Sequence, residues 1–440
     1  MGSEATTASA GKSSPGAFAM GRLSPGPGMA AKDVAAHQLA RIHSATIGIV
    51  AERGYEALKV RDVVSYAEVS TRAFYELFGS KEDCFLQTYD LIARRASRRI
   101  VAAQAGEPDW RKRSQLIFDE FLRGLEQRPE NARLALVEAY AAGETALEQA
   151  WRTERAFEGM LGECFARSPD GVVVPPLVIE GVVAGIAGVS RSHLLAGTMP
   201  KLLATKAELL DWTLCHVDEA ATELEALDRG SIWRDTTHEP LPAEPVRGDR
   251  ALIITAVAEL ATRHGYSRLT AARVRSAAGV SRKKFEAYFD DLEDCYLAAL
   301  EQRAADALAQ AARAQTAASS WAGSVYRAIS ALCSQVSTDR FLASVCLSDD
   351  FPPGPDGTRS RRRLLDAITE LLSDSSPQTT PATPFQATAS SVAIWSLFHH
   401  HVIRDAPLHR QVAATLSYLA LVPVIGAPAA IAAIRREQHA

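Results

Sequence analysis

The sequence predicts an all-α fold, and three observations carry this prediction. Apolar residues recur at helical spacing, as at Ile42, Ala45 and Ile49, which fall at i, i+3 and i+7. Glycines follow such periodic segments, at Gly54 and again at Gly265, in the position where helices commonly end. No stretch alternates polar and apolar residues for long enough to indicate a strand.

Length and composition narrow the class of protein. A chain of 440 residues is too long for one ordinary hydrophobic core, so two or three domains are expected. Its hydrophobic share of 47% and charged share of 23% are typical of soluble globular proteins. Because the formal net charge is −4, any nucleic-acid contact must come from a local basic patch. The 6 cysteines form no CxxC pair, which indicates reduced thiols in a cytoplasmic protein.

Two segments have a composition that could indicate a targeting signal or a membrane helix. Residues 1–36 are rich in Gly, Ser, Ala and Pro and lack a charged segment followed by an apolar run, which favours a disordered tail over a signal peptide. The most apolar stretch, Val412–Ile434, is interrupted by Pro423, Gly426 and Pro428. A membrane helix needs about 20 uninterrupted apolar residues. We therefore expect a buried interface helix there and no membrane location.

One segment occurs twice. Ile42–Leu86 superposes on Ile253–Leu297 without a gap, with about sixteen identities in 45 positions. The offset of 211 residues is far above the period of about 20–50 residues of a solenoid, so it predicts two successive units of similar length. The stretch Arg229–Asp249 holds three prolines and no periodic apolar face, which predicts a linker.

Each copy predicts two short helices joined by a tight turn. In the second copy they are residues 271–278 and 281–289, with Gly279 suited to a turn that needs positive φ. The first copy has Glu68 at that position, which costs about 1 kcal/mol if the positive φ is kept. The arrangement predicts a helix-turn-helix, whose second helix enters the DNA major groove.

The second short helix of the first copy has two distinct faces. Val69, Phe74 and Phe78 predict a buried face. The outer face carries the polar and aromatic candidates for recognition, namely Thr71, Arg72 and Tyr75. Serines precede the helices at capping positions, with Ser70 and Ser80 in the first copy. The two copies differ before the first short helix, where a lysine in the first replaces a capping threonine in the second.

This motif resembles the TetR family of transcriptional regulators, whose pattern here is Gly-Val-Ser, a few variable residues, Tyr-x-Tyr-Phe and then Ser-Lys-Glu. The first copy matches at Val69, Ser70, Tyr75, Phe78, Ser80, Lys81 and Glu82. The second copy matches at Gly279, Val280, Ser281, Tyr288, Phe289 and Glu293. The resemblance covers roughly 50 residues of each half, and the remainder matches only in length and helical character.

The resemblance implies that each half is a helix-turn-helix domain followed by a helical ligand-binding and dimerisation domain. The expected boundaries are a disordered tail at 1–36, a first helix-turn-helix domain at 37–96, a first effector domain at 97–228, a linker at 229–249, a second helix-turn-helix domain at 250–307 and a second effector domain at 308–440.

The resemblance also implies which residues contact DNA. Tyr75 and Lys81 occupy phosphate-binding positions, whereas Thr71, Arg72 and Ala73 lie where side chains reach base edges. The blander alternative is that Tyr75 packs and Arg72 is a solvated charge. The candidates in the first copy are Lys59, Ser70, Thr71, Arg72, Ala73, Tyr75 and Lys81, and those in the second are Thr270, Ser281, Arg282, Lys283, Lys284 and Tyr288.

The second copy departs from the family pattern, which leaves two interpretations open. Glu286 replaces the phosphate-binding tyrosine and Leu292 replaces the lysine. The residues 252–292 nevertheless carry a formal charge of +3, from seven basic and four acidic side chains. Either both copies read DNA as an intrachain pseudo-dimer on an asymmetric operator, or only the first copy reads it and the second is a sensing or docking partner in a dimer of chains.

The helical domains supply candidates for an effector pocket and for the contact between the halves. The pocket candidates are aromatic and histidine residues, although core packing is the more usual role of such residues in a helical domain. They are Trp110, Phe121, Tyr140, His193, Trp321, Phe341, Trp395 and His399. The run of three histidines at 399–401 predicts no metal site, because neighbouring helical residues fan out by about 100°. The segments Glu180–Ser190 and Ser390–His400, near a 210-residue offset, are rich in small residues that allow close helix approach. The resemblance implies a four-helix bundle at that place.

An enzyme is not expected, because the chain has no glycine-rich phosphate loop, no nucleophile elbow and no HExxH motif. The prediction is a cytoplasmic transcription regulator without cofactor or metal. Family habit makes it a repressor of a double-stranded DNA operator that is released by a small-molecule effector. A further homodimer of such chains stays open.

Overall fold

The computed structural model describes residues 31–168, 172–224, 226–227, 248–346, 355–373, 383–403 and 410–439. All regular elements in these ranges are helices, which confirms the all-α prediction. Most of the predicted tail and linker, residues 1–30 and 229–247, lies outside the described residues. Helix α1 begins at Ala31, inside the predicted tail, because the alanine-rich run there favours helix.

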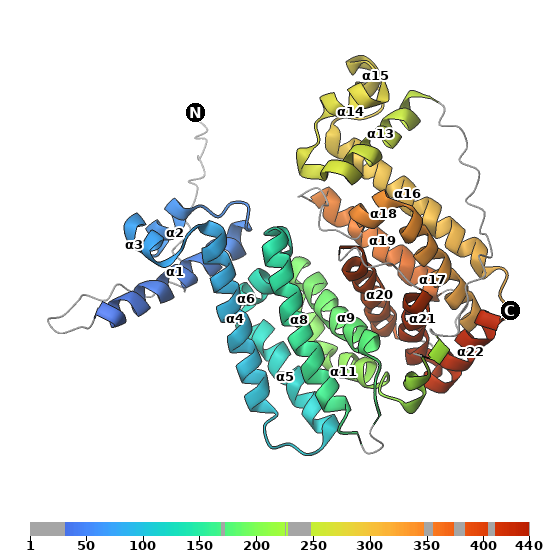
Figure 1. Ribbon diagram of the computed structural model, residues 1–440, viewed down its shortest axis with the longest axis horizontal. Coiled ribbons are helices and arrows are strands. Elements are labelled where there is room, and N and C mark those ends of the chain that lie inside the picture. The colour runs from blue at the N-terminus through green and yellow to red at the C-terminus, as the bar shows by residue number, and fades with distance from the viewer. Residues whose placement is uncertain are drawn as a thin grey trace, which may run out of the picture. The chain divides into compact units, whose positions relative to one another are not determined.

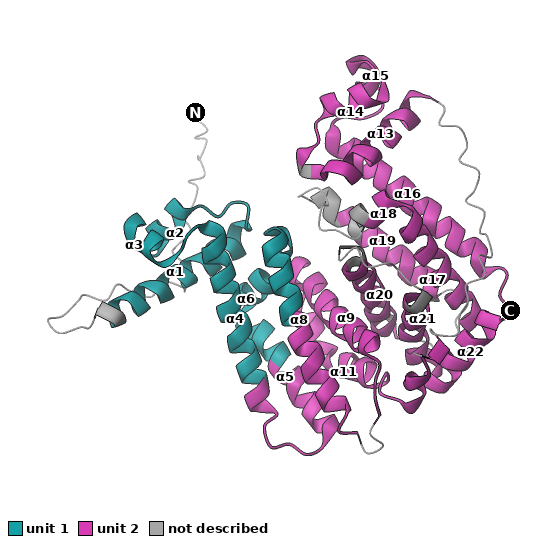
Figure 2. Ribbon diagram, in the orientation of Figure 1, with its two compact units in different colours: residues 1–100, 121–153 teal, residues 101–120, 154–440 magenta. Residues whose placement is uncertain are grey.

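The chain forms two compact units (Figure 2). One consists of residues 1–100 and 121–153, and the other of residues 101–120 and 154–440. The domain boundaries predicted from the sequence stay predictions.

The first unit is built from α1 to α4 and from the elements that follow α5 (Figure 1). Its elements are α1 (Ala31–Arg53), α2 (Val60–Tyr66), α3 (Thr71–Leu77), α4 (Lys81–Ala103), the end of α5 (Trp110–Gln127), α6 (Pro129–Arg133), the π-helix η1 (Leu134–Glu138), α7 (Ala139–Ala141) and the start of α8 (Glu144–Phe165). Helices α4, α5 and α8 continue from this unit into the second.

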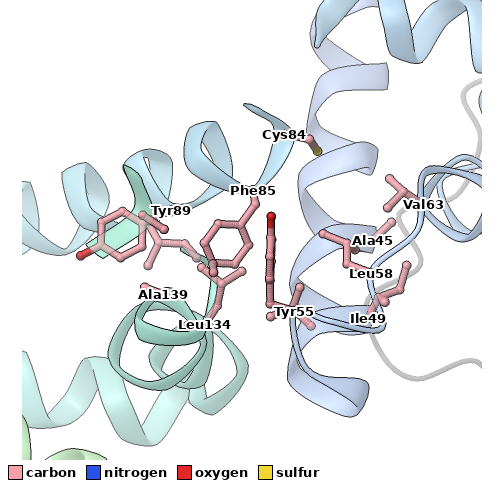
Figure 3. Packing of buried hydrophobic residues seen from close by; sticks show 14 of the residues in the cluster. Ala45, Ile49, Tyr55, Leu58, Val63, Cys84, Phe85, Tyr89, Leu134 and Ala139 are labelled. Atoms are coloured by element: carbon pink, nitrogen blue, oxygen red, sulfur yellow. The ribbon is translucent and has the colours of Figure 1, made fainter. Parts of the chain in front are cut away.

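A single hydrophobic cluster joins the helix-turn-helix of this unit to the later helices (Figure 3). Tyr55 and Phe85 meet edge to face with ring centroids 4.8 Å apart. Leu134 and Ala139, from the segment after α6, are fully buried in the same cluster. The core around α1 to α4 is therefore completed by residues about 50 positions further along the chain.

The second unit contains the rest of the first half and the whole of the second. Its elements from the first half, besides parts of α5 and α8, are α9 (Pro176–Leu195), α10 (Met199–Ala204), α11 (Lys206–Leu214) and the 3₁₀-helix η2 (Glu219–Glu223). The second half supplies α13 (Asp249–His264), η3 (Tyr266–Arg268), α14 (Ala271–Ala278), α15 (Arg282–Glu286), α16 (Leu292–Gln315), α17 (Trp321–Thr338), α18 (Arg340–Cys346), α19 (Pro355–Ser373), α20 (Pro384–Ile403), α21 (Arg410–Ile425) and α22 (Ala427–His439).

Two apolar helices lie at the centre of this unit and pack against each other. They are α9 and α20, which contain the segments Glu180–Ser190 and Ser390–His400, so the predicted contact between these segments is present. Among the described residues, α9 is the helix long and apolar enough to cross a membrane, but 61% of its apolar window is buried inside the protein. The stretch Val412–Ile434 forms α21 and most of α22, separated by Gly426 at φ 76°, and is largely buried, as expected for packed helices.

Candidate nucleic-acid interface

The helix-turn-helix of the first copy begins where α1 ends. Gly54 adopts φ 79° and donates its backbone N–H to the carbonyl of Val50 at 2.9 Å, which stops the helix. Gly265 does the same at the end of α13, with φ 73° and a 2.8 Å bond to Ala261. The glycine-terminated helices predicted from the sequence are confirmed.

The turn between the two short helices takes a left-handed residue in both copies. Gly279 has φ 66° and Glu68 has φ 48°, so the first copy keeps the positive φ that its sequence makes costly. Arg41 of α1 holds this residue, since its Nη2 donates to the Glu68 carbonyl at 3.4 Å and its Nη1 lies 3.8 Å from Oε2.

The helices are capped as the sequence predicts. Ser70 Oγ accepts a hydrogen bond from the Ala73 N–H at 3.1 Å at the start of α3. Ser281 Oγ accepts from the Lys284 N–H at 3.3 Å in the second copy. Thr270 caps α14, whereas Lys59, its counterpart before α2, makes no side-chain cap. Lys59 is exposed, so its ammonium is available to a phosphate.

Helix α3 exposes the face that the sequence assigns to recognition. Phe74 and Phe78 are buried, Ala73 is half-buried, and Thr71 and Arg72 point to solvent. Tyr75 is 55% exposed although it is a large aromatic residue. Arg72 Nε donates to Glu76 Oε1 at 2.8 Å, so contact with a base would exchange this surface ion pair for DNA.

Lys81 begins α4 and is partly held in place. Its Nζ lies 4.5 Å from the centre of the Tyr55 ring, a cation–π contact. Because Tyr55 is buried in the hydrophobic cluster, the contact links the ammonium to the core of the unit. The side chain is thereby held at the start of α4, next to the helix-turn-helix.

The second copy presents its cations differently. Helix α15 is shorter than α3, ending at Glu286, and Arg282 Nε donates to Glu286 Oε1 at 2.6 Å. Lys284 Nζ lies 3.0 Å from Asp249 Oδ2 at the start of α13. Lys283 is exposed and Tyr288 is 48% exposed. Two of the three predicted cations of this helix therefore have carboxylate partners.

Sequence reasoning did not single out two residues near the helix-turn-helix, one on its surface and one buried beneath it. Tyr66, the last residue of α2, is 53% exposed, and Arg53 Nη2 donates to its hydroxyl at 3.5 Å. In the sequence, the only hint of this exposed side chain is that an aromatic residue stands just before the predicted turn. Glu138 is buried and bonds the backbone of Tyr55, a link for which the sequence carries no local signal.

The effector-pocket candidates occupy varied places. Tyr140 is buried in the cluster of the first unit, and Phe341 packs edge to face on Tyr296 at 6.0 Å. Arg111 stacks 4.5 Å from the Trp110 ring centre. The remaining candidates are half-buried or buried, Phe121 in the first unit and His193, Trp321 and Trp395 in the second. The side chain of His399 lies outside the described residues. Their role in a pocket stays a prediction.

Within the described ranges, no group of three His, Cys, Asp or Glu side chains is placed to hold a metal ion. The cysteine thiols described there are mostly buried, and burial raises the pKa of Cys84 to about 11. These residues act as packing elements.

Comparison with known proteins bears on the first copy. Residues 42–88 match the family described as bacterial regulatory proteins, tetR family. The matched range contains α2, α3, the capping serines and the exposed face of α3. No curated protein matches the chain at significant similarity. Over residues 42–88, this chain thus carries the N-terminal helix-turn-helix domain of the tetR family of bacterial regulatory proteins.

Proposed function

We propose that the chain is a cytoplasmic transcriptional repressor in which two helix-turn-helix units, fused in one polypeptide, form an intrachain pseudo-dimer on an asymmetric operator and are released by a small-molecule effector. The observation that carries the proposal is the exposed face of α3, where Thr71, Arg72 and Tyr75 project outward from a buried Phe74. In a helix-turn-helix this face lies in the major groove.

The chemistry of this face divides into two kinds of contact. Tyr75, Lys81 and Lys59 offer a hydroxyl and two ammonium groups for phosphates, which fix the register on DNA. Arg72 offers a guanidinium that can bind guanine O6 and N7 together, which reads sequence. Because the pair of Arg72 with Glu76 is solvent-exposed, exchanging it for a guanine costs little.

The repeated architecture supports DNA binding by the second copy as well. The left-handed turn at Gly279, the cap at Ser281 and the buried Phe285 reproduce the geometry of the first copy. Thr270, Lys283 and Tyr288 are exposed for DNA. Since the two surfaces carry different side chains, the two half-sites should differ.

Selection of bound sites from random duplex DNA by the full chain, at a stated salt concentration, tests the proposal. Two unlike half-sites about one helical turn apart are the expected result. The Arg72→Ala variant should lose preference at a base of one half-site, and Lys283→Ala at the other. Arg152→Ala, at an exposed arginine of α8, is the matched control and should select the wild-type motif. The absence of any enriched motif would refute DNA reading.

A second candidate function follows from the carboxylates of the second copy. Glu286 occupies the place of Tyr75, Arg282 and Lys284 are paired, and Leu292 replaces the lysine. In that case only the first copy reads DNA, and the second unit senses or docks. A symmetric palindrome bound by two chains would favour this alternative.

A further inference from the structure

Helix α20 enters a groove that glycines of α9 leave open. A Cβ placed on Gly185 would lie 2.7 Å from Cη2 of Trp212 and 3.1 Å from the Cβ of Ala393. A Cβ on Gly181 would lie 2.9 Å from Cδ1 of Leu397, and one on Gly188 would overlap Val392. A larger residue at these positions of α9 would require the contacting side chains to shift, namely Leu397 and Leu419 at Gly181, Trp212 at Gly185 and Val392 at Gly188.

A buried histidine is held between two carboxylates beside this groove. His400 of α20 is 3% exposed, and its Nε2 lies 3.2 Å from Oε2 of Glu154 on α8. Its Nδ1 lies 3.2 Å from Oε1 of Glu180 on α9. Carboxylates only accept hydrogen bonds, so this arrangement favours an imidazolium that donates from Nδ1 to Glu180 and forms an ion pair with Glu154 through its Nε2 side.

Further polar contacts join the same two parts of the chain. Trp212 Nε1 donates to Ser390 Oγ at 3.1 Å, and the Tyr418 hydroxyl donates to the carbonyl of His216 at 3.3 Å. All these pairs unite the first half, residues 31–227, with the second half, residues 248–439. The contact between the halves is therefore specified by polar groups as well as by shape.

The two helices that meet here are not equivalent. The two helices correspond at an offset of 208 residues, from Pro176 and Pro384 at their starts to Leu195 and Ile403 at their ends. At this offset Glu180 corresponds to Thr388 and His400 to Ser192, whereas Gly185 and Gly188 correspond to the small residues Ala393 and Ser396. The carboxylates thus belong to the first half and the histidine to the second, while both helices supply small residues to the contact.

Pairing of like halves would lose the charge match. Between two second halves, His400 would face Thr388 instead of Glu180. Between two first halves, Ser192 would replace His400 beside the carboxylates. Leaving a buried charge without its partner is strongly unfavourable.

We infer that the α9–α20 contact is a pairing code, in which the His400–Glu154–Glu180 cluster selects the union of unlike halves and rejects like halves, while the glycines of α9 allow the two helices to approach closely. The partner of each half is the other half of the same chain. This inference rests on the intrachain pairing proposed above. It further implies that one chain, and not a dimer formed through this surface, binds the operator.

Covalent connection adds to the selection. The two halves belong to one polypeptide, and covalent linkage raises the effective concentration of one half for the other to about the millimolar range. Exchange of halves between two chains keeps the unlike contact, so it is the association that remains possible when intrachain pairing is blocked.

A charge-exchange experiment on the full chain tests the code. Glu180→His leaves two imidazoles beside Glu154, and His400→Glu leaves three carboxylates together, so each variant alone should lose the contact. When the two variants are co-expressed, the first half of either chain meets a complementary second half of the other. One of these contacts has the wild-type arrangement, and the other holds one imidazole and two carboxylates with the carboxylate at position 400 in the centre.

Native mass spectrometry and amide hydrogen exchange supply the readouts. The wild-type chain should show the mass of one chain, 47.4 kDa. Each variant alone should lose exchange protection in α9 and α20, at least tenfold, or fail to accumulate. The co-expressed pair should form a two-chain complex with protection restored. His401→Glu, one position further along α20, is the matched control and should behave as wild type.

Three results would overturn the inference. They are a wild-type dimer cross-linked between two α20 helices, wild-type protection in both single variants, and a co-expressed pair that stays unprotected. The test uses no DNA, so its outcome is independent of operator binding. A chain that follows the pairing code but selects no DNA motif would refute the proposed function and leave this inference standing.

Discussion

Oε2 of Glu138 accepts a hydrogen bond from the backbone N–H of Tyr55 at 3.0 Å, a contact between residues 83 positions apart. Glu138 ends the π-helix η1, and its Oε1 lies 3.2 Å from Arg133 Nη2. π-Helical turns are rare and frequent at functional sites. The bond connects the segment after α6 directly to the loop that follows α1.

Removing this carboxylate should destabilise the first unit. Glu138→Ala leaves the buried N–H of Tyr55 without an acceptor, which costs about 1–3 kcal/mol. Glu138→Gln keeps an acceptor oxygen and should lie closer to wild type. Denaturant unfolding and the exchange rate of the Tyr55 amide measure the difference. Equal stability of the two variants would show that the hydrogen bond is not what matters at this position.

Lys81→Ala should weaken DNA binding on all sequences and reduce the slope of log affinity against log salt by about 1, because one phosphate contact is lost. Arg72→Ala should instead relax the preference at one base, on the order of tenfold. Affinity titrations at several salt concentrations, on the selected site and on single-base variants of it, separate these effects. If Arg72→Ala weakened all sequences equally, the arginine would be a phosphate contact.

The turn residue Glu68 offers a stability test of backbone conformation. Glu68→Gly removes the positive-φ strain, whereas Glu68→Ala keeps it, and both lose the carboxylate near Arg41. The glycine variant should therefore be more stable than the alanine variant by about 1 kcal/mol. Thermal unfolding of both proteins gives the comparison. An alanine variant as stable as the glycine variant would contradict the left-handed turn.

The reading region could be predicted because its signals are local. The glycine stops, the serine caps and the buried Phe74 depend on residues within a few positions of each other, and all appear in the structure. The pair of Arg282 and Glu286 also follows from i,i+4 spacing, although the sequence interpretation counted the arginine as a free cation.

The contacts that sequence reasoning missed are long-range. The bond from Tyr55 to Glu138 and the ion pair of Lys284 with Asp249 need the packed fold to bring the groups together. The small residues of α9 correctly indicated close helix approach. The histidine run was considered only as a metal site, because nothing near His400 in the sequence points to Glu154 or Glu180.

The His400 cluster should stabilise the second unit up to moderately alkaline pH. Burial alone would lower the pKa of His400, but hydrogen bonds and charges of Glu154 and Glu180 outweigh it and raise the pKa to about 9. The folded pKa exceeds the unfolded value of about 6.5, so the contribution is full below pH 6.5 and is lost as pH rises through 9. Denaturant unfolding between pH 6 and 10 should show this loss in wild type and not in His400→Gln. His401→Gln serves as control and should keep the wild-type profile.

His216 should make the free energy of unfolding fall at acidic pH, the opposite direction from His400. It is fully buried, packs edge to face on Trp212 with ring centroids 5.1 Å apart, and burial lowers its pKa to about 4. The unfolded chain binds the proton first as pH falls below about 6.5, so the contribution is full above pH 6.5 and is lost progressively toward pH 4. A difference of this size corresponds to about 3 kcal/mol. His216→Leu should flatten the fall in unfolding free energy between pH 7 and 4.5, whereas His264→Gln, at an exposed histidine, should leave it unchanged. If the unfolding free energy of His216→Leu fell as steeply as that of the wild type, the acid sensitivity would have to arise from other groups. The first of these to substitute is His43, which is also buried and whose pKa is lowered to about 4.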